Sequence, residues 1–442
     1  MFLQDFTEEA IKLSKDGFTY NNRTIPFAIK AFICDAPAKA LITFCKSHTG
    51  FFACTKCMQK GKYIKARVCY PKIDYCERTD ENFRNRMQPE HHTGASILEI
   101  IPSINMVKSF PLDYMHLICL GVVKKLINIW LSRPISHRLS KTNVQHISSY
   151  LIEIRSCIPS DFVRKTRSLD DVARWKATEC RLFLLYCGPI VLKNILSSEK
   201  YLHFISLHIA IRILINANLY TKYLEYAHSL LKYFVKQFKV IYGTEYISHN
   251  VHELIHVVDN CRVFGPLDLY SAFPFENYMQ YLKRLIRTSH DPLAQLVNRI
   301  HESQNILITK PSKEIKLQMV QEHHVGPLPT EHFSAQFKKL IINNISFSTH
   351  FGDNCCYLKD KSIVLIENFA IKDNKYYFIG KKFINVTSFI SEPFQSSMLD
   401  IFLVHVLGEL SMSLIEDIAN KMIILPHTNN TYVVLPLLHT LC

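Results

Sequence analysis

Two pairs of metal-binding residues stand far apart in the sequence. Cys54 and Cys57 are separated by two residues, a spacing that lets both thiolates reach one tetrahedral zinc ion. His252 and His256 are four residues apart, so on a helix both imidazoles would lie on the same face. The two pairs make a complete set of four ligands, and we expect them to hold a structural Zn²⁺ ion. Spacing does not exclude rival ligands near the cysteine pair: Cys69, Cys76, His91 and His92.

The histidine segment permits a second interpretation. Residues 252–256 read His-Glu-Leu-Ile-His, the zinc-protease pattern in which two histidines bind catalytic zinc and the glutamate acts as a base. Such a protease needs a third ligand downstream and gives Cys54 and Cys57 no role. We therefore rank a zinc protease third among the hypotheses, and expect Glu253→Gln to leave zinc binding intact. Without any metal, the four residues would be two buried thiols and a polar helix face.

Asp35 stands where a catalytic carboxylate could stand. It follows the apolar run 24–34, which predicts a buried strand, and it precedes a helix predicted over residues 36–46. The end of a strand is where α/β folds place site residues. The alternative is that Asp35 is simply a good N-cap for the helix that follows.

Glu276 is the second candidate carboxylate, at the start of a helix that follows Pro274. An acid in the first helical turn is also favoured by the helix dipole, which is the structural alternative. On that helix Glu276 shares a face with Gln280, Lys283 and Arg287. A metal-binding carboxylate beside cations that hold a phosphate backbone would show this arrangement. We therefore expect DNA contacts from Lys283, Arg284 and Arg287.

The elements that must position these residues are of three kinds. Residues 7–15 predict a short helix, and between residues 97 and 256 the apolar side chains recur largely at helical spacing. The periodicity is lost over residues 305–332, where several prolines predict a linker. Beyond the linker, four segments are β-rich, and a Lys372-Asp373-Asn374 turn joins the first two: 362–371, 375–383, 401–407 and 432–437.

Length and charge limit the classes of function. A chain of 442 residues has room for two to three domains. Its formal net charge of +14 favours a polyanionic partner such as nucleic acid over a neutral metabolite. The first ten residues carry three acids, and charges interrupt the apolar stretches, so we expect neither secretion nor a membrane span. The 14 cysteines should then be reduced thiols.

Several blocks of the sequence, in this order, resemble those of CACTA-type (En/Spm-like) transposases. The similarity covers roughly residues 1 to 305, and the tail from about residue 330 more loosely resembles the C-terminal region of insect and cnidarian transposase-like proteins. The blocks are Ala31 to Ala40, Cys54-x-x-Cys57, Leu112-Asp113-Tyr114-Met115-His116, Arg174 to Glu179, and Gly265-Pro266 through Phe273-Pro274-Phe275-Glu276.

The resemblance implies a fold and a chemistry. Such transposases have an RNase H-like fold in which three carboxylates (Asp, Asp, Glu; DDE) hold two Mg²⁺ or Mn²⁺ ions, with a helical insertion before the Glu. Asp35 matches the second Asp and Glu276 matches the Glu. Related enzymes bind zinc through a CxxC and two histidines, here Cys54, Cys57, His252 and His256. The implied activity is DNA transposition by DNA cleavage and strand transfer, in the nucleus.

One element of the family pattern is missing. The first Asp belongs on the first strand of the RNase H-like sheet, and 34 residues precede Asp35 here. Asp5 and Asp16 lie in or beside a predicted helix, and Asp113 lies inside the insertion. We therefore expect an N-terminally truncated core that is catalytically incomplete on its own. The alternative is a non-enzymatic DNA- or protein-binding relic.

These inferences combine into one predicted organisation. The expected fold class is α/β plus α. The expected partner is DNA, and the chain could also form a homo-oligomer. We expect neither a membrane nor a small-molecule substrate as a partner. The predicted parts are a partial RNase H-like core with the CxxC (1–95), a helical insertion (96–250), a segment with HxxxH and the Glu-bearing helix (251–305), a linker (306–332) and a β-rich C-terminal domain (333–442).

Overall fold

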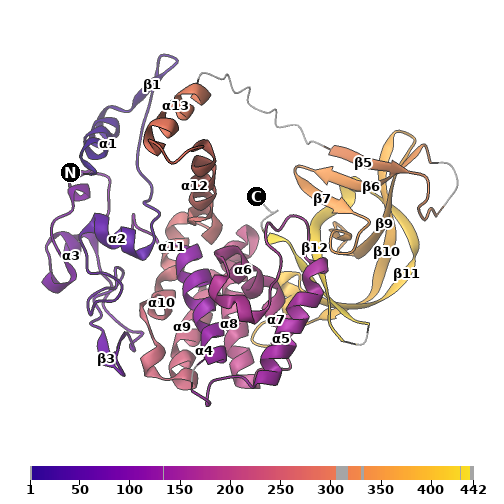
Figure 1. Cartoon of the computed structure of the whole chain (residues 1–442), viewed down its shortest axis with the longest axis horizontal. Helices are drawn as coiled ribbons and strands as arrows, with labels where there is room; N and C mark the ends of the chain where they lie inside the picture. Colours follow the sequence, from indigo (N-terminus) through magenta and orange to yellow (C-terminus); the bar gives the residue numbers. More distant parts are fainter. Residues whose placement is uncertain (1, 133, 305–316, 330–332, 429, 439–442) are drawn as a thin grey trace.

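Helices and strands occupy different parts of the chain in the computed structural model, which describes residues 2–132, 134–304, 317–329, 333–428 and 430–438 (Figure 1). An N-terminal region of short elements lies against a large helical block, and a β-sheet domain follows at the C-terminal end. The expected combination of a helical block and a C-terminal sheet is therefore confirmed.

The N-terminal region has little regular structure. Its helices are α1 (Gln4–Asp16), α2 (Ala36–Thr43) and α3 (Asp80–Arg84). Its described strands form two separate hairpins, β1 (Phe18–Tyr20) with β2 (Arg23–Ile25) and β3 (Lys62–Ile64) with β4 (Arg67–Cys69). The helices predicted over residues 7–15 and 36–46 are thus confirmed by α1 and α2.

The buried strand predicted over residues 24–34 is wrong for most of its length. Strand structure ends at Ile25, and the chain then runs without regular structure to Asp35. In this stretch the Phe32 N–H donates to the Ser109 carbonyl (2.8 Å), but no described strand lies alongside. An apolar β-prone segment becomes a strand only when a neighbour supplies the ladder. The described N-terminal residues therefore contain no sheet that confirms an RNase H-like core.

The helical block is built around one fully buried helix. In α8 (Ser198–Ile215), every residue from His203 to Ile215 is buried, because the helix is apolar on all sides. The other helices of the block pack around it: α4 (Lys124–Ser132), α5 (Lys141–Glu153), α6 (Ala177–Leu182), α7 (Gly188–Val191), α9 (Ala217–Tyr242), α10 (His249–Glu253) and α11 (Val257–Phe264).

A π-helix, Met115–Val123, runs directly into α4. Among the described helices, this joined stretch Met115–Ser132 is the one with the length and apolar character to cross a membrane. Since 56% of it is buried inside the protein, it has the character of a core helix.

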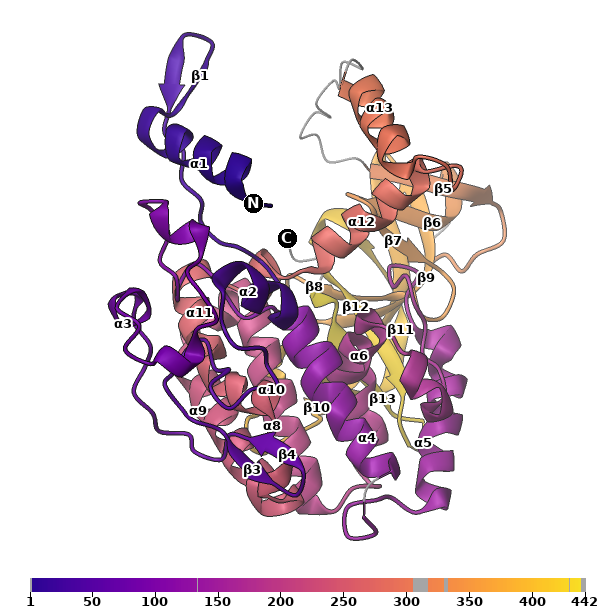
Figure 2. The same cartoon turned by 60° about the vertical axis from the view of Figure 1, so that its left-hand side comes forward.

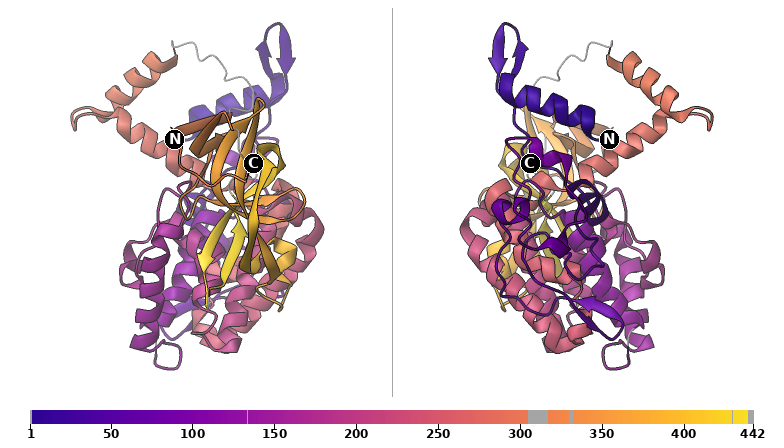
Figure 3. Two further views of the ribbon diagram at one scale, coloured as in Figure 1. Left: turned by 90° about the vertical axis from the view of Figure 1, so that its right-hand side faces the viewer. Right: turned by 90° about the vertical axis from the view of Figure 1, so that its left-hand side faces the viewer.

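Two helices project from the helical block. In α12 (Phe273–Leu285) no residue is buried, and α13 (Pro292–Gln304) folds back beside it. Figures 2 and 3 show this pair standing away from the body on the same side as α1 and the β1–β2 hairpin.

The C-terminal strands are all antiparallel, and six of them close into a barrel. The pairings run β8–β9–β10–β11–β13–β12 and back to β8, while β5, β6 and β7 extend the sheet beside β9. The strands are β5 (Leu317–His323), β6 (Ala335–Ile342), β7 (Ile345–Ser348), β8 (Cys355–Leu358), β9 (Ile363–Lys372), β10 (Lys375–Ser388), β11 (Phe402–Leu414), β12 (Ile418–Pro426) and β13 (Tyr432–Pro436).

Side chains on β12 alternate between two cores. Met422 and Ile424 belong to a cluster with members from all six barrel strands, whereas Ile423 and Leu425 belong to the large core of the helical block. The predicted turn between β9 and β10 is confirmed, with Asp373 and Asn374 both at positive φ, as a two-residue hairpin turn requires. The predicted linker fits less well, because β5 lies in it; its residues 305–316 and 330–332 lie outside the described residues.

Candidate metal centre and the adjoining pocket

The four predicted zinc ligands lie together in the folded chain. All four side chains are buried, and their ligand atoms lie within 4.8 Å of one another. The Sγ atom of Cys57 is 3.3 Å from Nε2 of His252, that of Cys54 is 3.8 Å from Nε2 of His256, and the two sulfurs are 3.5 Å apart. Bonds of about 2.3 Å to sulfur and about 2.0 Å to nitrogen give tetrahedral edges of about 3.5 Å. The cluster could therefore hold a metal ion such as zinc.

The cysteine loop is fixed by buried cations. The Arg78 guanidinium donates to the carbonyls of Cys54 (3.3 Å) and Cys57 (3.2 Å). Between the cysteines, the Lys56 ammonium donates to the carbonyls of Val107 (2.7 Å) and Phe110 (2.9 Å). These bonds hold both sulfurs in place and tie the loop to the segment that leads to Asp113.

The thiols have different acidities before any cation binds. Burial raises the pKa of Cys54, whereas the hydrogen bond with Cys54 lowers the pKa of Cys57. Bound zinc would stabilise both thiolates.

The rival ligands lie elsewhere. Nδ1 of His91 is 2.6 Å from the Phe52 carbonyl oxygen, and His92 packs against the Phe83 ring. The Cys69 thiol donates to the Glu245 carbonyl, and Cys76 is exposed. The tertiary structure thus selects among the alternatives that spacing left open.

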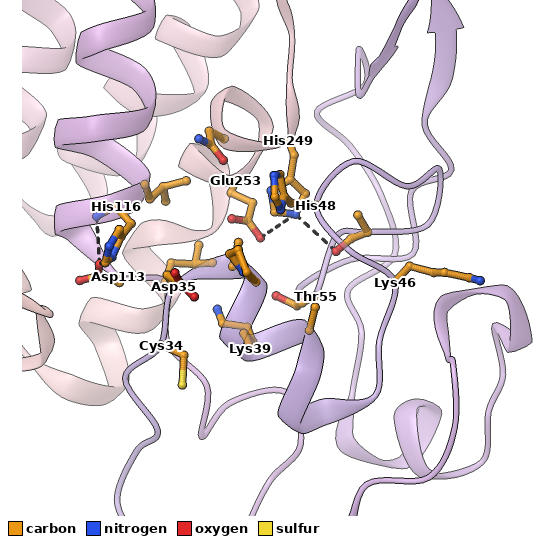
Figure 4. Close-up of a pocket in the computed structure, with 17 residues that line it drawn as sticks. Cys34, Asp35, Lys39, Lys46, His48, Thr55, Asp113, His116, His249 and Glu253 are labelled. Atoms are coloured by element: carbon orange, nitrogen blue, oxygen red, sulfur yellow. Dashed lines mark hydrogen bonds and ion pairs between the residues drawn. The ribbon is translucent and has the colours of Figure 1, made fainter. Parts of the chain in front are cut away.

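A pocket of about 250 Å³ adjoins the metal centre (Figure 4). Asp35 and Lys39 line it from α2, and His249 and Glu253 line it from α10. Glu253 lies 3.3 Å from Nε2 of His249. The Asp35 carboxylate accepts a hydrogen bond from the Ala38 N–H (2.7 Å), so the N-cap interpretation is confirmed while the residue also faces the pocket.

Asp113 and His116 form the opposite wall, and sequence reasoning did not select either as a site residue. One Asp113 oxygen accepts from the N–H groups of Met115 (3.2 Å) and Ala272 (2.7 Å). The other accepts from the His116 N–H (2.9 Å) and from its Nδ1 (2.5 Å). Four hydrogen bonds occupy the roughly four acceptor positions of a carboxylate, so Asp113 holds the structure in place and has no position left for a metal.

The pair is strongly coupled electrostatically. Burial alone would raise the pKa of Asp113, but the hydrogen bonds from His116 and from the backbone outweigh it and lower the pKa. The bond to Asp113 raises the pKa of His116, and the charges of Asp35 and Glu276 add to that effect.

The spacing Asp-x-x-His at the start of a helix was the signal in the sequence that could have identified this pair. The π-helix that begins at Met115 is a rare form that is frequent at functional sites.

Glu276 lies at the margin of this pocket. It is exposed in the first turn of α12 and is not one of the residues that line the pocket, but its charge reaches His116. Asp113 anchors the start of α12 through the Ala272 N–H, which keeps Glu276 on this side of the molecule. Lys283, Arg284 and Arg287 are exposed farther along the same projecting segment.

Comparison with known proteins adds one match. Residues 322–437 match a family model described as a domain of unknown function (DUF8592), which covers β6 to β13 completely and the last two residues of β5. No curated protein and no solved structure matches the chain.

Proposed function

We propose that this chain is a transposon-derived protein that acts on DNA in the nucleus and is related to the cut-and-paste DDE transposases. In this proposal the segment ending at Asp35, together with α2 and α12, corresponds to part of an RNase H-like core. The helical block is the insertion that separates Asp35 from Glu276.

The observation that carries the proposal is the meeting of blocks far apart in sequence. Asp35 and the Asp113–His116 pair line one pocket, Asp113 anchors the start of α12 at its margin, and Cys54 and Cys57 meet His252 and His256 beside it. All of these residues belong to the blocks or ligand pairs of the resemblance. If the short motifs matched the family only by coincidence, these residues would not be expected to lie together in the folded chain.

The zinc in this proposal is structural. Two thiolates and two imidazoles fill a tetrahedral site, whereas a catalytic zinc keeps one position for water. Glu253, the base of the protease hypothesis, is engaged with His249. The donor set thus favours a structural zinc site, which links the N-terminal region to the segment carrying His252 and His256. It does not favour the catalytic zinc site of a protease.

The proposed phosphodiester chemistry uses three carboxylates, and the described residues supply two candidates at this pocket. Divalent Mg²⁺ or Mn²⁺ would supply activation of the attacking oxygen and stabilisation of the leaving one. Asp35 and Glu276 are the carboxylates that would bind it, with Nε2 of His116 at the same pocket, and Asp113 cannot substitute because hydrogen bonds occupy its oxygens. We therefore expect the chain to bind DNA and not to cleave it alone.

The test is a nicking assay on supercoiled DNA with Mg²⁺ or Mn²⁺, with zinc content measured on the same samples. We expect no nicking by the wild-type chain and about one zinc per chain. Nicking that disappears in Glu276→Gln would show that a third ligand is present and would overturn the incomplete site. Peptidase activity lost in Glu253→Gln would overturn the DNA-acting function itself.

A further inference from the structure

We propose that a polynucleotide strand runs from the Asp35 pocket along a second, adjoining groove whose far end carries Lys124, Lys125 and the β3–β4 hairpin. This inference rests on the proposed function, since it names where DNA lies on a protein proposed to act on DNA.

The groove adjoins the pocket and shares a wall residue with it. A second hollow, of about 320 Å³, is lined on one side by Lys124, Lys125 and Asn128 and on the other by Tyr246, Ser248 and Asn250. Asn250 lines both hollows. α10 packs against the π-helix that leads into α4, and β4 contacts the segment Thr244–Tyr246 that precedes α10; Figure 2 shows the β3–β4 hairpin below α10.

One helix forms the wall of both hollows. His116 and Leu117 line the pocket, Leu120 and Gly121 follow one turn on, and Lys124, Lys125 and Asn128 continue along the same face. The stretch from His116 to Asn128 would span roughly 18 Å at the α-helical rise of about 1.5 Å per residue, and it is somewhat shorter because residues up to Val123 are π-helical and rise less per residue. That is about four to five nucleotide steps at the roughly 3.4 Å per-strand spacing of charges in B-form DNA.

The join between the two hollows requires a glycine. A Cβ atom on Gly121 would lie 2.5 Å from the amide nitrogen of Asn250 and 3.0 Å from the His116 carbonyl oxygen. The absence of a side chain therefore lets the Asn250 amide sit against the helix between the two hollows. An amide placed there can donate to a phosphate or a base edge.

The cations at the far end are held in position. The Lys124 ammonium donates to the carbonyls of Ala173 (2.9 Å) and Trp175 (3.4 Å), which leaves one of its three N–H groups for a ligand. Lys125 is close enough to β4 that its charge lowers the pKa of Cys69 against the larger effect of burial, which raises it. Two adjacent cations over an amide and a hydroxyl make a phosphate-binding surface.

The β3–β4 hairpin continues this surface. It is fixed to the groove wall by a bond from the Tyr70 N–H to the Ile247 carbonyl (2.8 Å), and the Arg67 guanidinium stacks over the Tyr246 ring at 5.2 Å. Lys65 neutralises Glu245 through a salt bridge of 2.6 Å. Lys62 and Tyr63 are exposed, Tyr63 to 67%. Exposed lysine beside exposed tyrosine suits a backbone contact beside a stacked base.

The test measures binding of the zinc-loaded full chain to fluorescein-labelled single-stranded and duplex oligonucleotides of one sequence, by fluorescence anisotropy at several salt concentrations. The variant Lys62→Gln/Lys125→Gln removes two groove charges. The matched control Lys141→Gln/Lys338→Gln removes two exposed charges from α5 and β6, neither of which lines the groove. Unchanged thermal unfolding of both variants serves as the folding control.

We expect the groove variant to weaken oligonucleotide binding at least about tenfold, and the control variant to weaken it less than about twofold. For a single strand, the slope of the logarithm of the binding constant against the logarithm of the salt concentration should become smaller by about 1.4 in the groove variant. Tyr63→Ala should weaken binding of the single strand more than binding of the duplex, because the Tyr63 ring is proposed to stack on an unpaired base. Should Lys125→Gln perturb folding, Lys62→Gln alone is expected to give half of the change in slope.

Two results would count against the inference in different ways. Equal weakening by the groove and control variants means diffuse binding over the basic surface and overturns the groove while leaving the proposed function. Failure of the wild-type chain to bind either oligonucleotide overturns the proposed function, and the groove with it.

Discussion

At the scale of single residues, the centre of this protein is Asp113. It is 4% exposed, and its four hydrogen bonds join the π-helix, His116 and the first residue before α12. A buried carboxylate with every acceptor position filled positions the groups around it. The orientation of His116 and the anchoring of α12 both depend on this one side chain.

Asp113→Asn should uncouple these roles. The amide keeps the size of the carboxylate but places an NH₂ group against N–H donors that the carboxylate accepted from. The free energy of unfolding, measured by urea titration, should therefore fall by about 3 kcal/mol. The pKa of His116, measured by NMR, should fall because the charged partner is lost. Asp16→Asn, at an exposed helix end, is the matched control and should change neither quantity. An unchanged His116 pKa in Asp113→Asn would contradict the coupling.

The metal centre permits an equally direct test. Removing zinc with a chelator, or changing Cys57→Ala, should lower the unfolding temperature and loosen the contact between the cysteine loop and α10. Cys76→Ala is the control, because Cys76 is exposed and lies outside the cluster. Metal content by mass spectrometry should fall from about one zinc to none only in the first variant. Equal zinc content in both variants would remove Cys57 from the ligand set.

At the scale of elements, α8 shows how a buried helix carries polar groups. Nε2 of His203 lies 3.0 Å from the Phe234 carbonyl oxygen and Nδ1 of His208 lies 2.8 Å from that of Leu184, so each neutral ring can donate one hydrogen bond, while its other nitrogen is buried without a partner. The Arg212 guanidinium donates to the Leu185 carbonyl (2.8 Å) and reaches that of Pro436 in β13 (3.4 Å). These polar groups fix the register of α8 against its neighbours.

The buried histidines predict an acid-sensitive fold. Burial lowers the pKa of His203 and that of His208 to about 3 each, against 6.5 in the unfolded chain. Between these values the unfolded chain takes up protons that the folded chain excludes, so stability is complete above about pH 6.5 and falls toward pH 3. Urea unfolding at a series of pH values should show this decline.

The decline can be assigned to one ring. His203→Phe should reduce the slope of stability against pH below 6.5, because it removes one proton-binding site of the unfolded chain. His146→Gln, at an exposed position on α5, should leave the slope unchanged. A slope that is the same in His203→Phe and wild type would mean that other groups control the acid transition.

At the scale of the whole molecule, the barrel and the helical block share one core. Ile423, Leu425, Val433 and Leu435 point out of the barrel into the cluster formed by the helices. At the same interface, the buried Lys421 ammonium is 2.6 Å from Asp161 in the helical block and 2.5 Å from Asp353 in the β domain. The family match at 322–437 therefore covers a unit that buries one face against the rest of the chain.

Residues 322–437 expressed alone should expose that face. We expect the fragment to aggregate or to associate, because a contiguous apolar patch of this kind is not stable in water. Changing Ile423, Leu425, Val433 and Leu435 to polar residues should make the fragment monomeric in light scattering. Since Met422, Ile424 and Val434 still fill the barrel interior, near-native circular dichroism should be retained. A soluble monomeric wild-type fragment would show instead that the barrel is an independent domain.

The sequence by itself determined the parts whose signals are local. Spacing identified the Cys54–Cys57 and His252–His256 pairs as candidate ligands, the helical periodicity located the helical block, and Asp373-Asn374 specified a hairpin turn. Such patterns depend on neighbours within a few residues, so one sequence is enough to find them.

The tertiary structure decided what depends on distant partners. Whether residues 26–34 form a strand depends on a neighbouring strand, which the described residues do not provide. Asp113 became central only because the Ala272 N–H, 159 positions away, bonds to it. The sharing of one core between the barrel and the helices also joins residues that no local pattern connects. Long-range hydrogen bonds and packing are properties of the folded chain, and they determine where the pocket, the groove and the metal centre lie.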